Sequence, residues 1–152
     1  MTTINLYTNI KAPIKTVFDL SRNIDVHMKS MGYTNEKAIA GRISGCIELG
    51  ETVTWEGKHF GLRIQHESII TAMNPPTYFV DEMKKGHFKW LKHKHIFKEE
   101  NEHTIMIDQF CYKTPYGIFG SIFDKIALKK HLINVLEKRS VQIKRLAEKQ
   151  KE

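Results

Sequence analysis

The sequence predicts an α+β fold in which a curved antiparallel sheet of about six or seven strands wraps around one long C-terminal helix. Two observations carry this prediction. Between residues 36 and 113 the apolar pattern is almost entirely that of strands, separated by turns at hairpin-like spacing. Beyond Pro115 the apolar period changes to three and four residues, which is typical of a helix.

The N-terminal residues predict one strand followed by two short helices. Residues 3–10 alternate apolar and polar side chains, as a half-buried strand does. Pro13 suits the first turn of a helix over residues 13–20. Asn23 is a suitable cap for a second helix that ends at Gly32.

The middle of the chain predicts the rest of the sheet. Strands are expected near residues 36–42, over 52–59, from 62 to a stop at Asn74, and over 77–83, 89–98 and 104–113. Short strands that follow one another without intervening helices form an antiparallel meander rather than a parallel sheet with crossovers.

The C-terminal segment carries one apolar stripe. Its members recur at steps of three, four or their sums: Phe119, Ile122, Ile126, Ile133, Leu136, Ile143 and Ala147. They predict one face of a continuous helix of about 30 residues, or roughly 45 Å at 1.5 Å per residue. A helix in a protein is stabilised mainly by packing of its apolar face, so the stripe is expected to lie on the sheet.

Length and composition are those of a globular protein. The 152 residues, of which 41% are hydrophobic and 27% charged, suit a single domain over 1–152. No apolar run is long enough to span a bilayer, and residues 1–10 lack a signal-peptide pattern, so we expect a cytoplasmic protein without stable membrane insertion. The two cysteines have no zinc-site spacing and predict no disulfide framework.

The net charge of +7 raises the question of a nucleic-acid partner. Nine of the Lys and Arg residues lie in the C-terminal helical pattern, interleaved with acidic residues, as on a solvated helix face. No basic run alternates with aromatic residues in the way that single-strand binding requires. We therefore expect no nucleic-acid partner, and the sequence leaves the oligomeric state open.

Several short motifs, taken in order, resemble the START-like (SRPBCC) superfamily. Residues 12–18 resemble its opening P-x-x-x-V-F. Residues 74–81, 86–90 and 93–97 resemble its series PP-x-x-F-x-D, G-x-F and H-x-H-x-F. These motifs span nearly the whole chain, and the sequence is most similar to bacterial members that carry the H-x-H motif.

The resemblance implies a helix-grip fold, in which a seven-stranded sheet holds the long helix and two small helices close one end. It also implies a hydrophobic tunnel, which in relatives holds lipids, sterols, polyketides or plant hormones. Some relatives are polyketide cyclases or dehydratases, whereas many only carry ligands, and the fold does not decide between them. We expect no cofactor, because the chain has no phosphate-binding glycine loop.

Strand alternation predicts a polar patch on the concave face. His93 and His95 alternate with lysines, so they share the inward face with the apolar side chains around them. Asp81 on the preceding strand and Asp108 on the following one fall on the same face, and hairpin registers bring all four together. His66, one strand further away, is an additional candidate.

Three interpretations of this patch remain open. The side chains form a self-satisfied network that fixes strand register, or they hold the polar end of an apolar ligand, or they carry catalysis or a metal. Two histidines two residues apart can bind a metal together with a carboxylate, but no third ligand is fixed by the spacing. We therefore assign neither a metal site nor a catalytic residue, and leave enzymatic activity open.

We expect a carrier or sensor of a small hydrophobic or amphipathic molecule. Its polar end meets the patch, and its apolar body lies along Trp55, Ile64, Phe79, Phe97, Phe110, Ile122 and Ile126. The alternatives are a cyclase- or dehydratase-like enzyme that uses the same patch, and an interaction module that docks through its basic helix face. The other histidines are expected at the surface or in turns: His27, His59, His87, His103 and His131.

Overall fold

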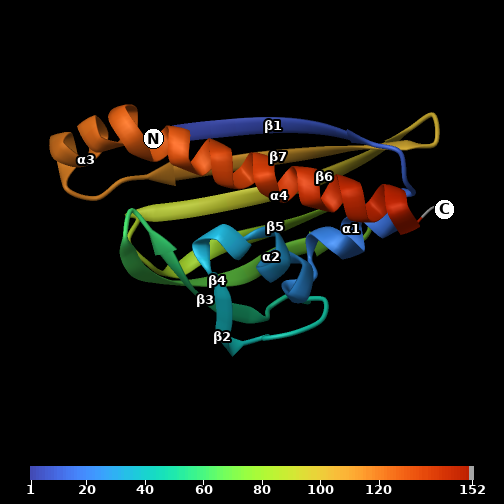
Figure 1. The fold of residues 1–152 in the computed structure, drawn as a ribbon, viewed down its shortest axis with the longest axis horizontal. Helices are drawn as coiled ribbons and strands as arrows, with labels where there is room; N and C mark the ends of the chain where they lie inside the picture. The colour runs from blue at the N-terminus through green and yellow to red at the C-terminus, as the bar shows by residue number, and fades with distance from the viewer. Residues whose placement is uncertain (151–152) are drawn as a thin grey trace.

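The computed structural model describes residues 1–150 and confirms the predicted α+β architecture (Figure 1). One sheet contains seven strands in the order β1-β7-β6-β5-β4-β3-β2. The strands are β1 (Thr2–Ile10), β2 (Lys37–Gly41), β3 (Thr52–His59), β4 (Leu62–Asn74), β5 (Tyr78–Lys85), β6 (Trp90–Glu100) and β7 (His103–Lys113). The helices are α1 (Ile14–Ser21), α2 (Ile24–Ser30), η1 (Gly32–Thr34), α3 (Gly117–Phe123), η2 (Asp124–Leu128) and α4 (Lys129–Gln150).

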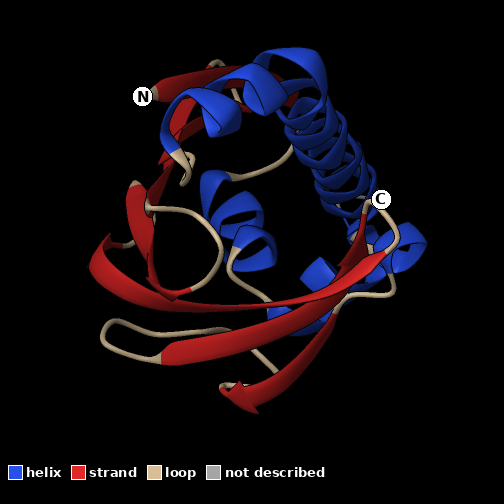
Figure 2. Cartoon of the chain, turned by 90° about the vertical axis from the view of Figure 1, so that its left-hand side faces the viewer, coloured by secondary structure: helices blue, strands red, loops and turns tan. Residues whose placement is uncertain are grey.

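The sheet is antiparallel throughout and strongly curved. Consecutive strands pair from β2 to β7, and β1 closes the other edge against β7. Register shifts in β4, at Glu67–Ser68 and between Ile70 and Ala72, mark the β-bulges that bend this strand. Figure 2 shows the strands curling around the helices, so the sheet presents a concave face to them.

Helix α4 lies across this concave face, beside β1 in Figure 1. Ile143 and Ala147 join an apolar cluster with Phe18, while Leu136 joins a second cluster with Tyr112. The stripe on this part of the helix therefore packs on the sheet, as its spacing predicts.

The prediction of one uninterrupted stripe is wrong for the first part of the helix. Phe119, Ile122 and Ile126 are 78%, 48% and 75% exposed. The reason is a π-helical turn, η2, between α3 and α4. A π turn adds one residue to the turn, which rotates the residues on its two sides by about 100° relative to a regular α-helix.

The residue that the π turn directs toward the sheet is Asp124. Its carboxylate accepts a hydrogen bond of 2.5 Å from the Thr2 hydroxyl and another from the Tyr112 hydroxyl. Thr2 lies in the edge strand β1 and Tyr112 in its neighbour β7, so a buried carboxylate rather than an apolar side chain fixes this end of the helix.

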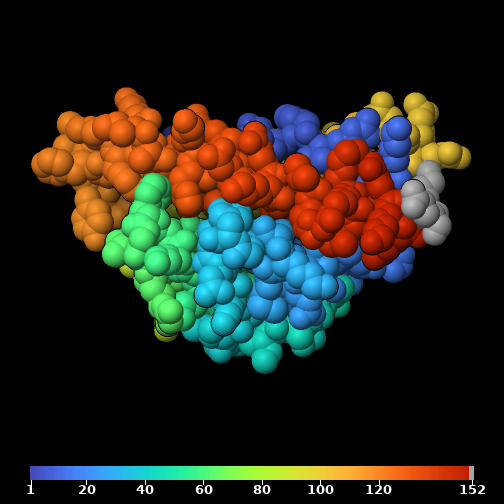
Figure 3. All heavy atoms as spheres, viewed as in Figure 1, coloured from blue at the N-terminus to red at the C-terminus, as the bar shows by residue number. Residues whose placement is uncertain are grey.

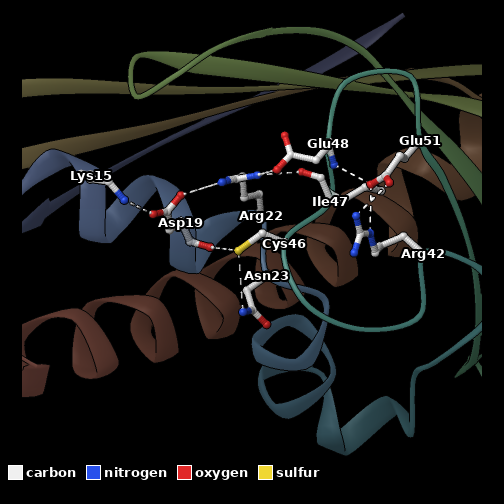
Figure 4. Close-up of polar contacts among 9 residues, drawn as sticks. All are labelled: Lys15, Asp19, Arg22, Asn23, Arg42, Cys46, Ile47, Glu48 and Glu51. Carbon is white, nitrogen blue, oxygen red and sulfur yellow. Dashed lines mark hydrogen bonds and ion pairs between the residues drawn. The ribbon is translucent and has the colours of Figure 1, made fainter.

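The two short helices after β1 also match the prediction, and an arginine ties them to the β2–β3 loop (Figure 4). The Asn23 side chain caps α2 by accepting a 3.1 Å hydrogen bond from the Val26 N–H. Arg22 pairs with Asp19 at 2.9 Å and with Glu48 of the loop at 2.7 Å. These contacts hold the loop against the junction of α1 and α2.

A substitution at Ile143 tests whether the buried apolar stripe of α4 stabilises the fold. Replacing Ile143, which is 2% exposed, by Ala should lower the free energy of unfolding by about 2–5 kcal/mol, because the truncation removes apolar contacts and leaves a void. Val141→Ala on the same helix is the matched control, since Val141 is 66% exposed and its truncation should cost less than about 0.5 kcal/mol. Urea unfolding measures both, and equal effects would contradict this packing.

Candidate functional site

The concave face of the sheet and α4 enclose a cavity of about 880 Å³, whose lining at one end includes residues of the β3–β4 hairpin and of the start of the long helix. Its size lies within the usual range of small-molecule sites. Its wall is mainly apolar and includes Trp55, Ile64, Ile70, Phe79, Leu91, Phe110, Leu132 and Leu136. The alternate residues of β4 from Leu62 to Ile70 all line it, as their period of two predicts.

Eight of the twelve residues that the sequence suggested as ligand contacts line this cavity: Trp55, Ile64, His66, Phe79, Asp81, His93, His95 and Phe110. Four are not among the lining residues. Phe97 packs in the core against Phe18, with ring centroids 5.4 Å apart, and Asp108 lies buried beside the two histidines. Ile122 and Ile126 face outward because of the π turn.

The predicted polar patch is assembled at one wall of the cavity. Strand register places Asp81 opposite His93 and His95 opposite Asp108. The shorter hydrogen bonds run diagonally between these pairs: His93 Nε2 lies 2.8 Å from Asp108 Oδ1, and His95 Nε2 lies 2.7 Å from Asp81 Oδ2. The His93 and His95 rings lie 3.7 Å apart, so the four side chains form one contiguous network.

Arg139 of α4 completes this network, and sequence reasoning missed it. Its guanidinium lies 3.3 Å from Asp108 Oδ1, donates a 3.0 Å hydrogen bond to the Ser21 carbonyl and approaches His95 Nδ1 at 3.5 Å. The signal was present in the spacing, because residue 139 follows Leu136 by three positions and precedes Ile143 by four, which places it on the buried stripe. We name these five residues the His/Asp/Arg network.

The electrostatics of the network favour ionised carboxylates. Burial alone would raise the pKa of Asp108, but the Arg139 charge and the hydrogen bonds of the two histidines outweigh it and hold that pKa well below its usual range. Burial acts in the same way on Asp81, and its hydrogen bond with His95 lowers the pKa to about 2. Burial and repulsion from His95 lower the pKa of His93 to about 4.

These protonation states define the hydrogen-bond directions. A neutral His93 with its proton on Nε2 donates to the Asp108 carboxylate, and its Nδ1 then remains an acceptor. Asp108 Oδ2 is buried and has no hydrogen-bond partner among residues 1–150, so the donors converge on Oδ1.

Asp81, His93 and His95 also have the composition of a metal site. One ligand atom from each lies within 4.8 Å of the other two. However, the Nε2 atoms of both histidines are engaged by carboxylates, and the Arg139 guanidinium already supplies a positive charge at Asp108. The contacts therefore fit a network neutralised by arginine better than a site prepared for a dication.

A second polar cluster lies in the same cavity and corrects the expectation for three histidines. His27, His59 and His131 line the cavity rather than the surface. His27 Nε2 lies 2.9 Å from Glu36 Oε1, and His59 Nδ1 lies 2.8 Å from His131 Nε2. Burial would raise the pKa of Glu36, but its bonds with His27 and His59 lower it to about 2. These residues come from separate elements, so no local spacing predicted their meeting.

Comparison with solved structures identifies the architecture. A protein from Chromobacterium violaceum matches with a TM-score of 0.73 at 12% identity, over 96% of each chain. Major latex-like protein 151 from Panax ginseng matches at 0.70 and 13% identity, over 96% of this chain and 97% of the other. A START superfamily protein from Mycobacterium smegmatis matches at 0.67 and 12% identity, over 93% of this chain and 98% of the other. The chain has the START-like helix-grip fold.

At these identities the comparison shows the fold alone. No family model matches the sequence, and no curated protein matches it significantly.

A substitution of Arg139 tests whether this arginine compensates the buried negative charge of Asp108. Arg139→Met should lower the free energy of unfolding by about 3–5 kcal/mol, because the ionised Asp108 stays buried without its cation. Arg145→Met is the control, since it removes the same charge from an exposed position of α4. The double variant Asp108→Asn/Arg139→Met should recover part of the loss. Urea denaturation that gave equal values for Arg139→Met and Arg145→Met would refute this role.

The pKa of His93 predicts how stability depends on pH. Below its ordinary pKa of 6.5 the unfolded chain protonates this residue, whereas the folded protein resists protonation until about pH 4. The free energy of unfolding should therefore decrease as pH falls from 6.5 to 4, with about 3 kcal/mol from this residue. Urea unfolding across this range should show a flatter slope for His93→Gln, and an unchanged slope for the surface control His103→Gln. If His93→Gln keeps the full slope, the assignment fails.

Proposed function

We propose that the protein binds a small hydrophobic or amphipathic molecule in its internal cavity. The observation that carries this proposal is the cavity itself: about 880 Å³ between sheet and helix, with a largely apolar wall and a few clustered polar groups. The apolar side chains that line an empty cavity lack the van der Waals contacts that they would have in a closed core. An apolar molecule bound in the cavity would restore those contacts.

The His/Asp/Arg network supplies the polar end of the proposed site. Asp81, His93, His95 and Arg139 line the cavity, while Asp108 supports them from β7 behind the wall. The ionised Asp81 carboxylate can accept a hydrogen bond, and so can Nδ1 of a neutral His93. This chemistry favours a ligand head with a hydrogen-bond donor, such as a hydroxyl or amine, over a carboxylate.

The same geometry gives less support to an enzyme than to a carrier or sensor. A general base works best with a pKa near the operating pH. The pKa of His93, lowered to about 4 by burial, makes this imidazole a weak base at neutral pH, and Asp81 and Asp108 are more acidic still. The interior is therefore better suited to holding a polar group than to removing its proton, and we favour a carrier or sensor.

Filling the cavity tests the proposal. The probe is an environment-sensitive fluorophore such as 8-anilinonaphthalene-1-sulfonate, together with native mass spectrometry of the purified protein. Val135→Trp, which introduces a bulky ring at a cavity-lining position of α4, should reduce binding at least tenfold because the ring occupies the ligand's space. Val141→Trp adds the same ring on the exposed side of the helix and should leave binding unchanged. No probe binding, or equal binding to both variants, would refute the proposal.

The anchoring role of the network needs a separate measurement. His93→Gln keeps a hydrogen-bonding side chain of similar length but changes its geometry, so it should weaken binding of a long-chain alcohol about tenfold while affecting the matching alkane little. Calorimetric titration compares the two ligands, with His103→Gln as the control. Equal losses for alcohol and alkane would assign the network to structure rather than to ligand recognition.

A further inference from the structure

One end of the molecule exposes a cluster of large apolar side chains. They come from the β3–β4 hairpin and from the beginning of the long helix: Phe60, Leu62, Tyr116, Ile118, Phe119, Ile122, Phe123 and Ile126. Their exposed fractions range from 45% to 83%. Figure 3 shows the helix start projecting at this end, above the hairpin. We call this cluster the apolar end patch.

The members of the patch belong together in space. The Phe60 and Phe123 rings lie 5.3 Å apart and join the hairpin to the helix. The π turn directs Asp124 inward, which leaves Ile122 and Ile126 on the outer surface on either side of it. A contiguous group of this size on a protein surface marks an interaction site, whereas single exposed apolar residues need no explanation.

The exposed charges along the helix part of the patch have one sign. In residues 113–130 the exposed charged side chains are lysines: Lys113, Lys125, Lys129 and Lys130. Asp124, the acidic residue of this segment, is buried and bonded to Thr2 and Tyr112. Large apolar side chains bordered by lysines are the composition of helices that lie in the interface of an anionic bilayer.

We propose that the apolar end patch docks the protein on an anionic lipid bilayer. The Ile and Phe side chains enter the boundary between head groups and acyl chains, and the lysines contact the anionic head groups. Docking is peripheral, because within residues 1–150 no helix has the length and apolarity needed to cross a membrane. Phe60, Phe119 and Phe123 also line the cavity, so this contact places one end of the cavity wall next to the lipid.

The test is co-sedimentation with vesicles of phosphatidylcholine, with and without phosphatidylglycerol. The wild-type protein should bind the anionic vesicles, bind the neutral ones far more weakly, and dissociate as salt rises. Ile118→Ser/Ile126→Ser should reduce binding at least tenfold, since neither residue lines the cavity and both are more than 70% exposed. Leu49→Ser/Val141→Ser alters exposed apolar residues elsewhere and should bind normally.

Two triple variants with the same net charge show whether vesicle binding depends on the position of the lysines or only on their number. Removing Lys125, Lys129 and Lys130 by substitution with Gln should weaken binding to anionic vesicles roughly 100-fold, at about fivefold per lysine. The same substitution at Lys85, Lys92 and Lys98, which are exposed on the sheet strands, removes equal charge and should have a much smaller effect. Equal losses in the two triple variants would overturn the proposal.

Two further outcomes would also overturn it. One is the absence of binding to anionic vesicles. The other is a wild-type dimer, seen by light scattering, that Ile118→Ser/Ile126→Ser converts to a monomer without any vesicle binding, since a second copy would then cover the patch. Vesicle binding that persists in Val135→Trp separates this proposal from ligand binding in the cavity.

Discussion

The ion pair between Arg139 and Asp108 is the contact on which the arrangement of sheet and helix depends. Arg139 joins α4 to β7 through Asp108 and to the end of α1 through the Ser21 carbonyl. Because both charges are buried, removing either leaves the other without compensation in a medium of low polarity. The pair thus fixes the position of the long helix at its middle. Beside the cavity, few apolar contacts between the helix and the sheet are available to fix it.

This anchor explains how the protein can keep a cavity and still hold its helix. One apolar cluster, around Phe18 and Ile143, packs α4 near its C-terminal end, and another, around Leu136 and Tyr112, packs the opposite part of the helix. The His/Asp/Arg network lies between them on the cavity wall. Its hydrogen bonds are directional, so they define a distance between sheet and helix that apolar side chains alone would tend to close.

Sequence periodicity predicted the features that arise within one strand or one hairpin. Alternation placed His93 and His95 inward, and hairpin pairing brought Asp81 and Asp108 to them, because each step depends only on near neighbours in the chain. The contacts of Glu36 with His27 and His59, and of His59 with His131, depend on the tertiary fold, which periodicity does not encode. Arg139 was missed because its charge suggested solvent, although its spacing indicated burial.

The π turn has an evolutionary consequence for the chain. It makes the two parts of the long helix differ in phase by about 100°, so the residues facing the sheet before Asp124 and after Leu128 have the same period but are out of phase. Loss of one residue here would restore a regular α-helix and rotate the segment that precedes it as a unit. Single-residue insertion or deletion in Asp124–Leu128 is therefore a route by which related sequences could exchange an outward-facing apolar surface for an inward-facing one without altering the rest of the fold.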